Sequence, residues 1–529
     1  MDNLTDRALK ECQAVDKLDV DACKRIWMAC CPNGYDTEYN TETEKTILDA
    51  IGVEKAGQYR AWKADFDREH DEAMRSAAKA FRDDREREIK KRNAAGAARQ
   101  MEQSYMQDIF SLDEIQEKIN RLKPAEISSH FTLDDIGNGL LFSTLFSDVL
   151  RYNTTARSWY FYDGISWRED VGSVTAMLAG EVLQRCLYLY AVDISLEYQN
   201  HVRKLGSVNT RERMLKDAQK HKPLKSEDLD RDPRYFNLQN GVLDLKEMRL
   251  IPHNPDLLLS KVSGCEFDPS ASSSLWDNFI IDIMQGDRDK ADYLQRALGY
   301  SLTGKANEHA MFLCYGSTTR NGKSTLLRSV GRAFGDYATT LAPDMLASRN
   351  GRNADAPSEN LSDLRGARFV HIEEPSRSML FDAGVVKSLT GGTLIKARKL
   401  HQSNVTFETT FAAFLATNAL PRVDYPTLFM SDRLRVIEFN RHFEPSEQDH
   451  ALNDRLAEPY TQSAILNWLL DGLVEYRERG LTPPGVIEQS IALYEQQSDK
   501  LGCFIADVLV KDPGHNLKIG DVYAGYGEW

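Results

Sequence analysis

The chain has 529 residues, of which 42% are hydrophobic, so it can build about two to four domains with ordinary cores. Its formal net charge of −14 argues against a protein coated with nucleic acid. A narrow basic channel stays compatible, because charge acts within about a Debye length. The polar start is not a secretory signal, no apolar run approaches the ~18 residues that span a bilayer, and eight cysteines are too few for a disulfide framework. We therefore expect a reduced cytoplasmic protein without a membrane partner.

Residues 1–125 are expected to form a helical N-terminal region, to which the sequence assigns no role. The segment 62–102 is dense in alanine and in charges of both signs, which is typical of a solvent-exposed helix rather than of a nucleic-acid-binding arm. Four cysteines fall in this region without a nearby histidine or C-x-x-C spacing, so buried thiols are favoured over a zinc site. They are Cys12, Cys23, Cys30 and Cys31.

The rest of the chain divides by its local pattern. Residues 126–290 are expected to form a mixed α/β domain, with aromatic strands in SWYFYDGISWRED and a hairpin signal at Asn240-Gly241. In residues 291–445 short apolar runs alternate with helical stretches, which predicts an α/β domain around a mostly parallel sheet. Residues 446–500 predict helices, and residues 501–529 follow as a final segment.

A glycine-rich segment, GSTTRNGKST, lies between the apolar run HAMFLCY and a helical stretch, as a phosphate-binding loop does. Five residues separate Gly316 from Gly322, whereas the usual loop has four. Because such a loop faces an anion with its N–H groups and helix dipole, Lys323 is expected to reach the β- and γ-phosphates of ATP, and Ser324 to ligate Mg²⁺. The candidate nucleotide-binding residues are Gly316, Arg320, Asn321, Gly322, Lys323, Ser324 and Thr325. The alternative is a surface turn.

Three later apolar runs carry polar residues that ATP hydrolysis could use. RFVHIEEP ends at Glu373 and Glu374, of which one can orient Mg²⁺ while the other polarises the attacking water. FAAFLATN ends at Asn418, whose amide can bond that water or the γ-phosphate. Arg433 and Arg435 stand at the start of another run, and an arginine there could stabilise transition-state charge at a neighbouring subunit. Taken singly, these are also ordinary turn acids, a turn asparagine and surface arginines.

Taken in order, these motifs resemble the superfamily 3 helicases, in particular the phage, plasmid and poxvirus-type primase-helicase branch. The segments that carry the resemblance are GSTTRNGKS, RFVHIEEP, KSLTGGTLIKARKLHQ, LATNALP and DRLRVIEF. Upstream, TLDDIGNG, FYDGISW, NGVLDL, HNPD and YLQRALGYSLTG are also similar to that branch. The similarity extends from about residue 130 to residue 529.

The resemblance implies an AAA+ ATPase and helicase core over 291–445, a helical lid over 446–500 and, in 501–529, the start of a winged-helix-like DNA-binding module. In that family a hexameric ring hydrolyses ATP between subunits and moves along single-stranded DNA. The implied partners are therefore single-stranded or forked DNA and further copies of the chain, with a primase or an origin-binding protein as another candidate. A phage-encoded chain would act in the bacterial cytoplasm.

The same resemblance gives roles to individual residues. Glu374 takes the family's acidic position and would hold Mg²⁺ through water, because a proline follows it as in the relatives; Glu373 is the second candidate. Asn418 takes the role of a sensor of the γ-phosphate. Arg433 becomes the finger that acts on the neighbouring subunit's ATP, ahead of Arg435.

Residues 393–404 would form a hairpin that projects into the pore of the ring. Its basic and polar residues are Lys396, Arg398, Lys399 and His401. Six copies of them would contact DNA phosphates and give an acidic chain a basic channel, whereas the alternative is a solvated hairpin tip. The chain departs from the family pattern at Gly392-Thr393, where relatives have Gly-Asp, and by the extra residue in its phosphate loop.

A primase domain would need paired carboxylates on strands to hold metal ions. The nearby Asp-x-Asp pairs, Asp19 with Asp21 and Asp65 with Asp67, lie in helix-like surroundings, where Asp19 or Asp21 fits a helix N-cap. The sequence therefore predicts an ATP-driven replicative DNA helicase of a phage or mobile element. Two alternatives stay open: a bifunctional primase-helicase, and a nucleotide-switched DNA-binding module that does not unwind DNA.

Overall fold

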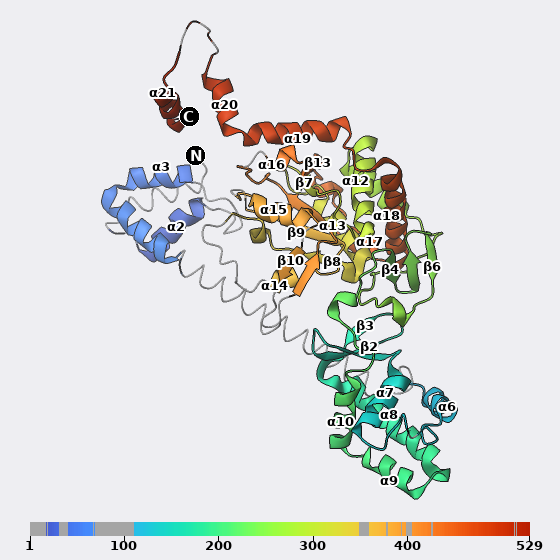
Figure 1. Ribbon diagram of the computed structural model, residues 1–529. Helices are drawn as coiled ribbons and strands as arrows, with labels where there is room; N and C mark the ends of the chain where they lie inside the picture. The colour runs from blue at the N-terminus through green and yellow to red at the C-terminus, as the bar shows by residue number, and fades with distance from the viewer. Residues whose placement is uncertain are drawn as a thin grey trace. The chain divides into compact units, whose positions relative to one another are not determined.

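The chain divides into two compact units, residues 1–105 and 106–529, each with its own hydrophobic core (Figure 1). A computed structural model describes residues 17, 19–30, 41–66, 68, 110–127, 129–348, 359–376, 379–392, 394–397, 405–424, 427–510, 512, 514 and 516–528. Within these ranges, none of the helices combines the length and the apolar character that crossing a membrane requires.

The N-terminal unit is helical where it is described, as expected. It contains α2 (Val20–Cys30), α3 (Thr41–Ile51) and a helix over 53–66. Asp19 Oδ1 accepts the N–H of Ala22 at 2.7 Å, so this aspartate caps α2. Cys23 and Cys30 are buried in the small core, while Cys12 and Cys31 lie outside the described residues. In the described ranges no group of three histidine, cysteine or acidic side chains could hold a metal ion.

The second unit begins with helices around a three-stranded antiparallel sheet. The helices are α6 (Leu112–Leu122), α7 (Asp135–Phe146), α8 (Val174–Tyr190), α9 (Leu196–Lys204) and α10 (Val208–Ala218). The strands are β1 (Leu150–Asn153), β2 (Ser158–Tyr162) and β3 (Trp167–Glu169). Phe142, Phe146 and Trp159 lie in their shared core. Because α6 packs on α8, residues 106–125 join this unit rather than the N-terminal region to which the sequence assigned them.

A second antiparallel sheet follows, formed by β4 (Tyr235–Leu238), β5 (Gly241–Asp244) and β6 (Arg249–Ile251). The expected hairpin is present, but Leu238 pairs with Gly241, so the turn is Gln239-Asn240 and Gly241 begins the next strand. A Cβ on Gly241 would lie 2.8 Å from the carbonyl oxygen of Ile251. The glycine is therefore required by the close approach of β6. Helices α11 (Ser274–Ile283) and α12 (Arg288–Tyr300) lead into the central sheet.

Five parallel strands form the central sheet, which confirms the expected α/β fold. They are β7 (Met311–Tyr315), β8 (Ala338–Thr340), β9 (Phe369–Glu373), β12 (Ala412–Thr417) and β13 (Leu434–Glu438). Their spatial order is β13-β7-β12-β9-β8, and each neighbouring pair is parallel. The short apolar strands are buried on both faces, as parallel sheets are.

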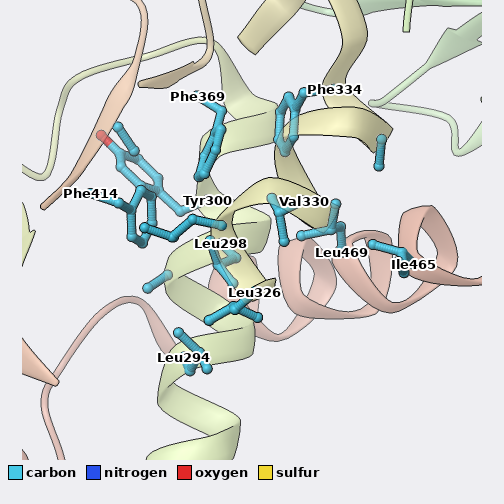
Figure 2. Packing of buried hydrophobic residues seen from close by; sticks show 14 of the residues in the cluster. Leu294, Leu298, Tyr300, Leu326, Val330, Phe334, Phe369, Phe414, Ile465 and Leu469 are labelled. Atoms are coloured by element: carbon cyan, nitrogen blue, oxygen red, sulfur yellow. The ribbon is translucent and has the colours of Figure 1, made fainter. Parts of the chain in front are cut away.

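Alternate residues of these strands face two different cores. On one face, Phe369 and Phe414 pack with α12, α13 (Lys323–Phe334) and α18 (Pro459–Arg479). Figure 2 shows this packing, with side chains from the sheet and the three helices converging on one another. On the other face, Val370, Leu415 and Val436 pack with α15 (Ala383–Thr390). Helix α13 is thus held firmly against the sheet, and with it the loop that precedes it.

The remaining elements flank this core. They are α14 (Glu359–Ser362), β10 (Leu394–Ala397), β11 (Val405–Glu408), α16 (Thr427–Met430), α17 (Leu452–Leu456), α19 (Gly485–Ser498), α20 (Lys500–Val508) and α21 (Ile519–Glu528). Strands β10 and β11 form a separate antiparallel pair. Helices α17, α18 and α19 occupy the expected helical region 446–500, and Phe504 of α20 packs edge-on against Tyr526 of α21.

Candidate active site

Three strand ends meet at the carboxyl edge of the central sheet. Tyr315, at the end of β7, lies opposite Thr417 of β12, and Ala416 lies opposite Glu373 of β9. Strand β12 therefore separates the loop that follows β7 from the acids that follow β9. Ligands of parallel α/β sheets bind at this edge. Of the candidate residues, the structure brings together the loop, both glutamates and Asn418.

The glycine-rich loop is shaped by its two end glycines. Gly322, which precedes α13, has a φ of 83°, and a Cβ there would lie 2.4 Å from Ile283 Cγ2. Gly316 receives similarly close contacts and donates its N–H to the carbonyl of Thr417 at 3.2 Å. No side chain caps the first turn of α13. Its N–H groups and positive dipole end are therefore available to an anion.

Lys323 is the buried cation of this site. Its side chain is 5% exposed, and its ammonium donates to Asn321 Oδ1 and Asn418 Oδ1, both at 2.8 Å. Burial lowers the pKa of Lys323 to about 8, while the neighbouring Cys314 and Glu374 oppose this shift. The ammonium is therefore still mostly charged at neutral pH.

The two glutamates at the end of β9 differ in their surroundings. Glu374 has an exposed side chain and a φ of 52°, a conformation that non-glycine residues rarely adopt, and its N–H donates to the carbonyl of Ala416 at 3.2 Å. The charge of Glu374 acts on the Lys323 ammonium. Burial lowers the pKa of His371, and it is the charge of Glu373 that opposes that shift. The two carboxylates therefore have different titratable neighbours, Lys323 for Glu374 and His371 for Glu373.

Three other loop and helix candidates border the same edge. Ser324 is exposed in the first turn of α13, and its hydroxyl bonds to no other described residue. Thr325 follows it and is half-buried. Arg320 is exposed, has a φ of 58° and accepts the N–H of Phe443 on its carbonyl at 2.9 Å. The segment around Phe443 thus packs along the outside of the loop.

Arg433 lies at the opposite edge of the sheet. Its carbonyl accepts the N–H of Met311 at 2.7 Å, so it stands beside the first residue of β7. Its Nη1 donates to Thr390 Oγ1 at 2.8 Å, and its buried Nε has no acceptor among the described residues. Arg435 lies within β13, is 14% exposed and stands 3.8 Å from Asp432. Neither arginine joins the site of its own chain.

The expected DNA-binding hairpin is described only in its strands. Strands β10 and β11 are antiparallel, and Lys396 lies opposite Thr406. The structure does not describe the Lys396 side chain, and Arg398, Lys399 and His401 lie outside the described residues, as does Thr393. The basic hairpin tip therefore stays a prediction.

A cavity of about 420 Å³ adjoins the loop, and no motif pointed to it. Its lining residues are Leu275, Asn278, Phe279, Asp282, Arg320, Gly322, Thr325, Phe443, Glu447, Gln448, Asp449, His450, Leu452, Asn453 and Arg455. Asn278 and Asp282 are one helical turn apart on α11, exposed, and without a side-chain hydrogen bond to any described residue. Phe279 and Leu452 give the cavity apolar walls.

Two family models match the chain over separate ranges. One, described as "D5 N terminal like", matches residues 139–285. The other, described as "Family of unknown function (DUF5906)", matches residues 314–433. The second range runs from the end of β7 to Arg433 and contains the loop, both glutamates and Asn418.

Relatives with assigned names come from viruses. A helicase candidate of Acanthamoeba polyphaga mimivirus is 26% identical over 323 residues, which are 57% of this chain and 33% of that protein. A primase candidate of African swine fever virus is 24% identical over 325 residues, which are 57% of this chain and 34% of that protein. The chain thus spans about a third of the length of these curated relatives. One solved structure, the apo form of the NrS-1 C-terminal region, is similar over 72% of this chain and 83% of its own length, at 11% identity and a TM-score of 0.41.

Proposed function

Because these matches support a viral protein of the superfamily 3 helicase or primase type, we propose that the chain is an ATP-driven DNA helicase. The observation that carries the proposal is the buried Lys323 ammonium at the carboxyl edge of the sheet, bonded to two neutral amides. Among the described residues no carboxylate lies within ion-pair distance of it. A buried cation paired only with amides is costly, and a phosphate anion would complete its surroundings.

The described residues fit a nucleotide with Mg²⁺. Ser324 Oγ and the Glu374 carboxylate are exposed oxygen atoms without hydrogen-bond partners among the described residues, and oxygen atoms are the ligands that Mg²⁺ prefers. In the proposal Lys323 would donate to the β- and γ-phosphates, while Ser324 and, through water, Glu374 would hold Mg²⁺. Mg²⁺, when bound, neutralises negative charge on the phosphates.

Hydrolysis needs a water placed in line with the γ-phosphate. In the proposal Glu374 polarises this water, and the Asn418 amide at the end of the neighbouring strand orients it. Glu373 is the less suitable base, because it belongs to β9 and lies on the same face of that strand as His371. The strained backbone of Glu374 supports the same choice, since such conformations persist where the surrounding structure fixes a functional side chain.

The cavity beside the loop offers room for the nucleoside. It adjoins Gly322 and Thr325, so a nucleotide whose phosphates rest on the loop would extend its base and ribose toward α11. The apolar walls would cover the faces of a base, and the unpaired Asn278 amide and Asp282 carboxylate would bond the edge of an adenine ring.

The ring and the DNA contacts complete the proposal. In a ring that hydrolyses ATP between its subunits, Arg433 would act as an arginine finger on the next subunit's ATP. Lys396, Arg398, Lys399 and His401 would line the pore and contact DNA phosphates. A primase or an origin-binding protein would be a further partner.

Strand displacement on a forked DNA with ATP tests the proposal. The wild type should separate the strands, and Lys323→Ala should lower ATP turnover roughly 10²–10³-fold, because it removes charge stabilisation of the phosphates. Lys246→Ala is the matched control, since this lysine is exposed in the turn between β5 and β6. ATP hydrolysis by the wild type without strand displacement would support the nucleotide-switched DNA-binding alternative, and equal turnover by Lys323→Ala would refute the ATP site.

A bifunctional primase-helicase is the second candidate, and the primase name of the African swine fever virus relative favours it. The aligned portion is 34% of that protein, so the name does not locate a primase activity within it. In this chain Asp19 caps a helix, which leaves it unsuited to a pair of metal-holding carboxylates with Asp21. Dinucleotide synthesis from nucleoside triphosphates on a single-stranded template would establish this candidate, and its absence would remove it.

A further inference from the structure

The lengthened phosphate loop contains a buried side chain, Asn321. It is 4% exposed, and its Nδ2 donates to the carbonyl of Thr318 at 2.6 Å, within the same loop. The residue before it, Arg320, has a φ of 58°, which turns the chain at that point and directs Asn321 inward. An asparagine bonded across three residues of its own loop restricts the loop as an Asx-type turn does.

Gly316 makes the space that this amide occupies. A Cβ on Gly316 would lie 2.3 Å from Asn321 Nδ2, 2.6 Å from the Phe439 carbonyl and 3.1 Å from Lys323 Nζ. The first residue of the loop, the amide of Asn321 and the lysine ammonium are therefore in mutual contact. The amide thus occupies the space that a side chain at position 316 would need.

The hydrogen bonds of Lys323 divide between a fixed acceptor and an exposed one. An ammonium has three N–H donors. One N–H donates to Asn321, which is buried and hydrogen-bonded to the carbonyl of Thr318. Another donates to Asn418, which is exposed at the end of β12. A third donor is left for a phosphate oxygen. A second phosphate contact would most easily displace Asn418, because the buried Asn321 has no other donor among the described residues to replace the lysine.

We propose that Asn321 is a positioning residue that closes the lengthened loop and holds the Lys323 ammonium at the phosphate site, and that nucleotide binding releases Asn418 from this lysine. This inference rests on the proposed ATP site. It assigns Asn321 to the lysine rather than to direct contact with phosphate. Asn418 then becomes available to orient the attacking water only when a phosphate is bound.

A double-mutant cycle on nucleotide affinity tests the assignment. Asn321→Ala should weaken ATP binding about tenfold, the effect of one lost hydrogen bond to a charged group. In the Lys323→Ala background the same change should alter affinity less than about twofold, because the residue acts through the lysine. Asn307→Ala, at the opposite edge of the sheet, should leave affinity unchanged in both backgrounds. Asn418→Ala should instead lower kcat with little change in nucleotide affinity.

The outcomes separate this inference from the proposed function. The inference would be overturned if Asn321→Ala lowered ATP affinity equally with and without Lys323. It would also be overturned if Asn321→Ala left ATP affinity unchanged. If Asn321→Ala does not fold, Asn321→Leu has a similar shape, lacks both hydrogen bonds and enters the same cycle. Wild-type protein that binds no ATP, or binds it equally well after Lys323→Ala, would overturn the ATP site and the inference with it.

Discussion

The two edges of the central sheet differ in how many of the proposed catalytic residues a single chain brings together there. At the edge where the strands end, the loop with Lys323, Glu374 and Asn418 come from three neighbouring strands, and the Lys323 ammonium bonds to Asn418. At the edge where the strands begin, Arg433 meets Thr390 of α15 and keeps a buried Nε without an acceptor in the described part of the chain. One edge gathers the residues of the proposed phosphate site, and at the other edge one nitrogen of Arg433 has no acceptor among the described residues.

The length of β7 keeps the residues at one edge of the sheet out of reach of those at the other. Arg433 stands beside the first residue of β7 and the loop follows the last, so the strand separates them by roughly 15 Å at about 3.3 Å per residue. An arginine side chain cannot span that distance. Under the proposed function Arg433 would therefore act on a phosphate bound to another subunit, as a ring of head-to-tail subunits would allow. Under the proposed function each chain contributes parts of two different ATP sites.

The largest expected effect comes from mixing two inactive variants. Lys323→Ala and Arg433→Ala should each abolish most ATP turnover, by about 10³-fold for the arginine. Mixed at equal amounts, they should regain about one quarter of wild-type turnover, since random neighbours in a head-to-tail ring restore one interface in four. ATP turnover measured over a series of mixing ratios checks this, with particle size by light scattering as the control for assembly. A mixture as inactive as its components would show that Arg433 of one chain does not complement Lys323 of another, and would break the comparison.

A smaller effect is expected from comparing the two arginines, because one substitution should lower kcat and the other should lower the melting temperature. Arg433→Ala should lower kcat strongly and leave the melting temperature nearly unchanged. Arg435→Ala should change kcat only a few-fold and lower the melting temperature, because its side chain is 14% exposed within β13 and loses packing when truncated. Steady-state ATP turnover and thermal unfolding of both variants distinguish the two. Strong loss of kcat in Arg435→Ala at unchanged stability would transfer the finger role to that residue.

The smallest expected effect concerns the cavity at the carboxyl edge. Asn278→Ala and Asp282→Ala should each raise KM for ATP about fivefold to tenfold, the effect of roughly one hydrogen bond. Their kcat should stay the same, because contacts to the base bind the ground state and the transition state alike. Asp277→Ala, exposed on the same helix and not among the lining residues, is the control. An unchanged KM for ATP in both variants would exclude this cavity as the binding site of the adenine ring.

Local sequence determined much of the fold and the composition of the site. Apolar runs of five or six residues alternating with amphipathic stretches are sufficient to predict a parallel α/β sheet, because strands buried on both faces cannot alternate polar and apolar residues. The loop was recognisable since its glycines and its Lys-Ser pair must lie between a strand and a helix. The acids and Asn418 followed because the carboxyl ends of parallel strands meet at one edge.

The tertiary structure decided what depends on strand order, on the face of a strand and on contacts between distant segments. Only the placement of β12 between β7 and β9 brings Asn418 to the lysine, and only the left-handed backbone at Glu374 separates that residue from Glu373 on β9. The cavity joins α11 to residues 443–455, which no local pattern connects. The bond from Asn321 to Lys323 depends on how an irregular loop folds back on itself. Periodicity and spacing predict which side chains a segment contains and how it folds locally. Packing across the whole sheet determines which other side chains they contact.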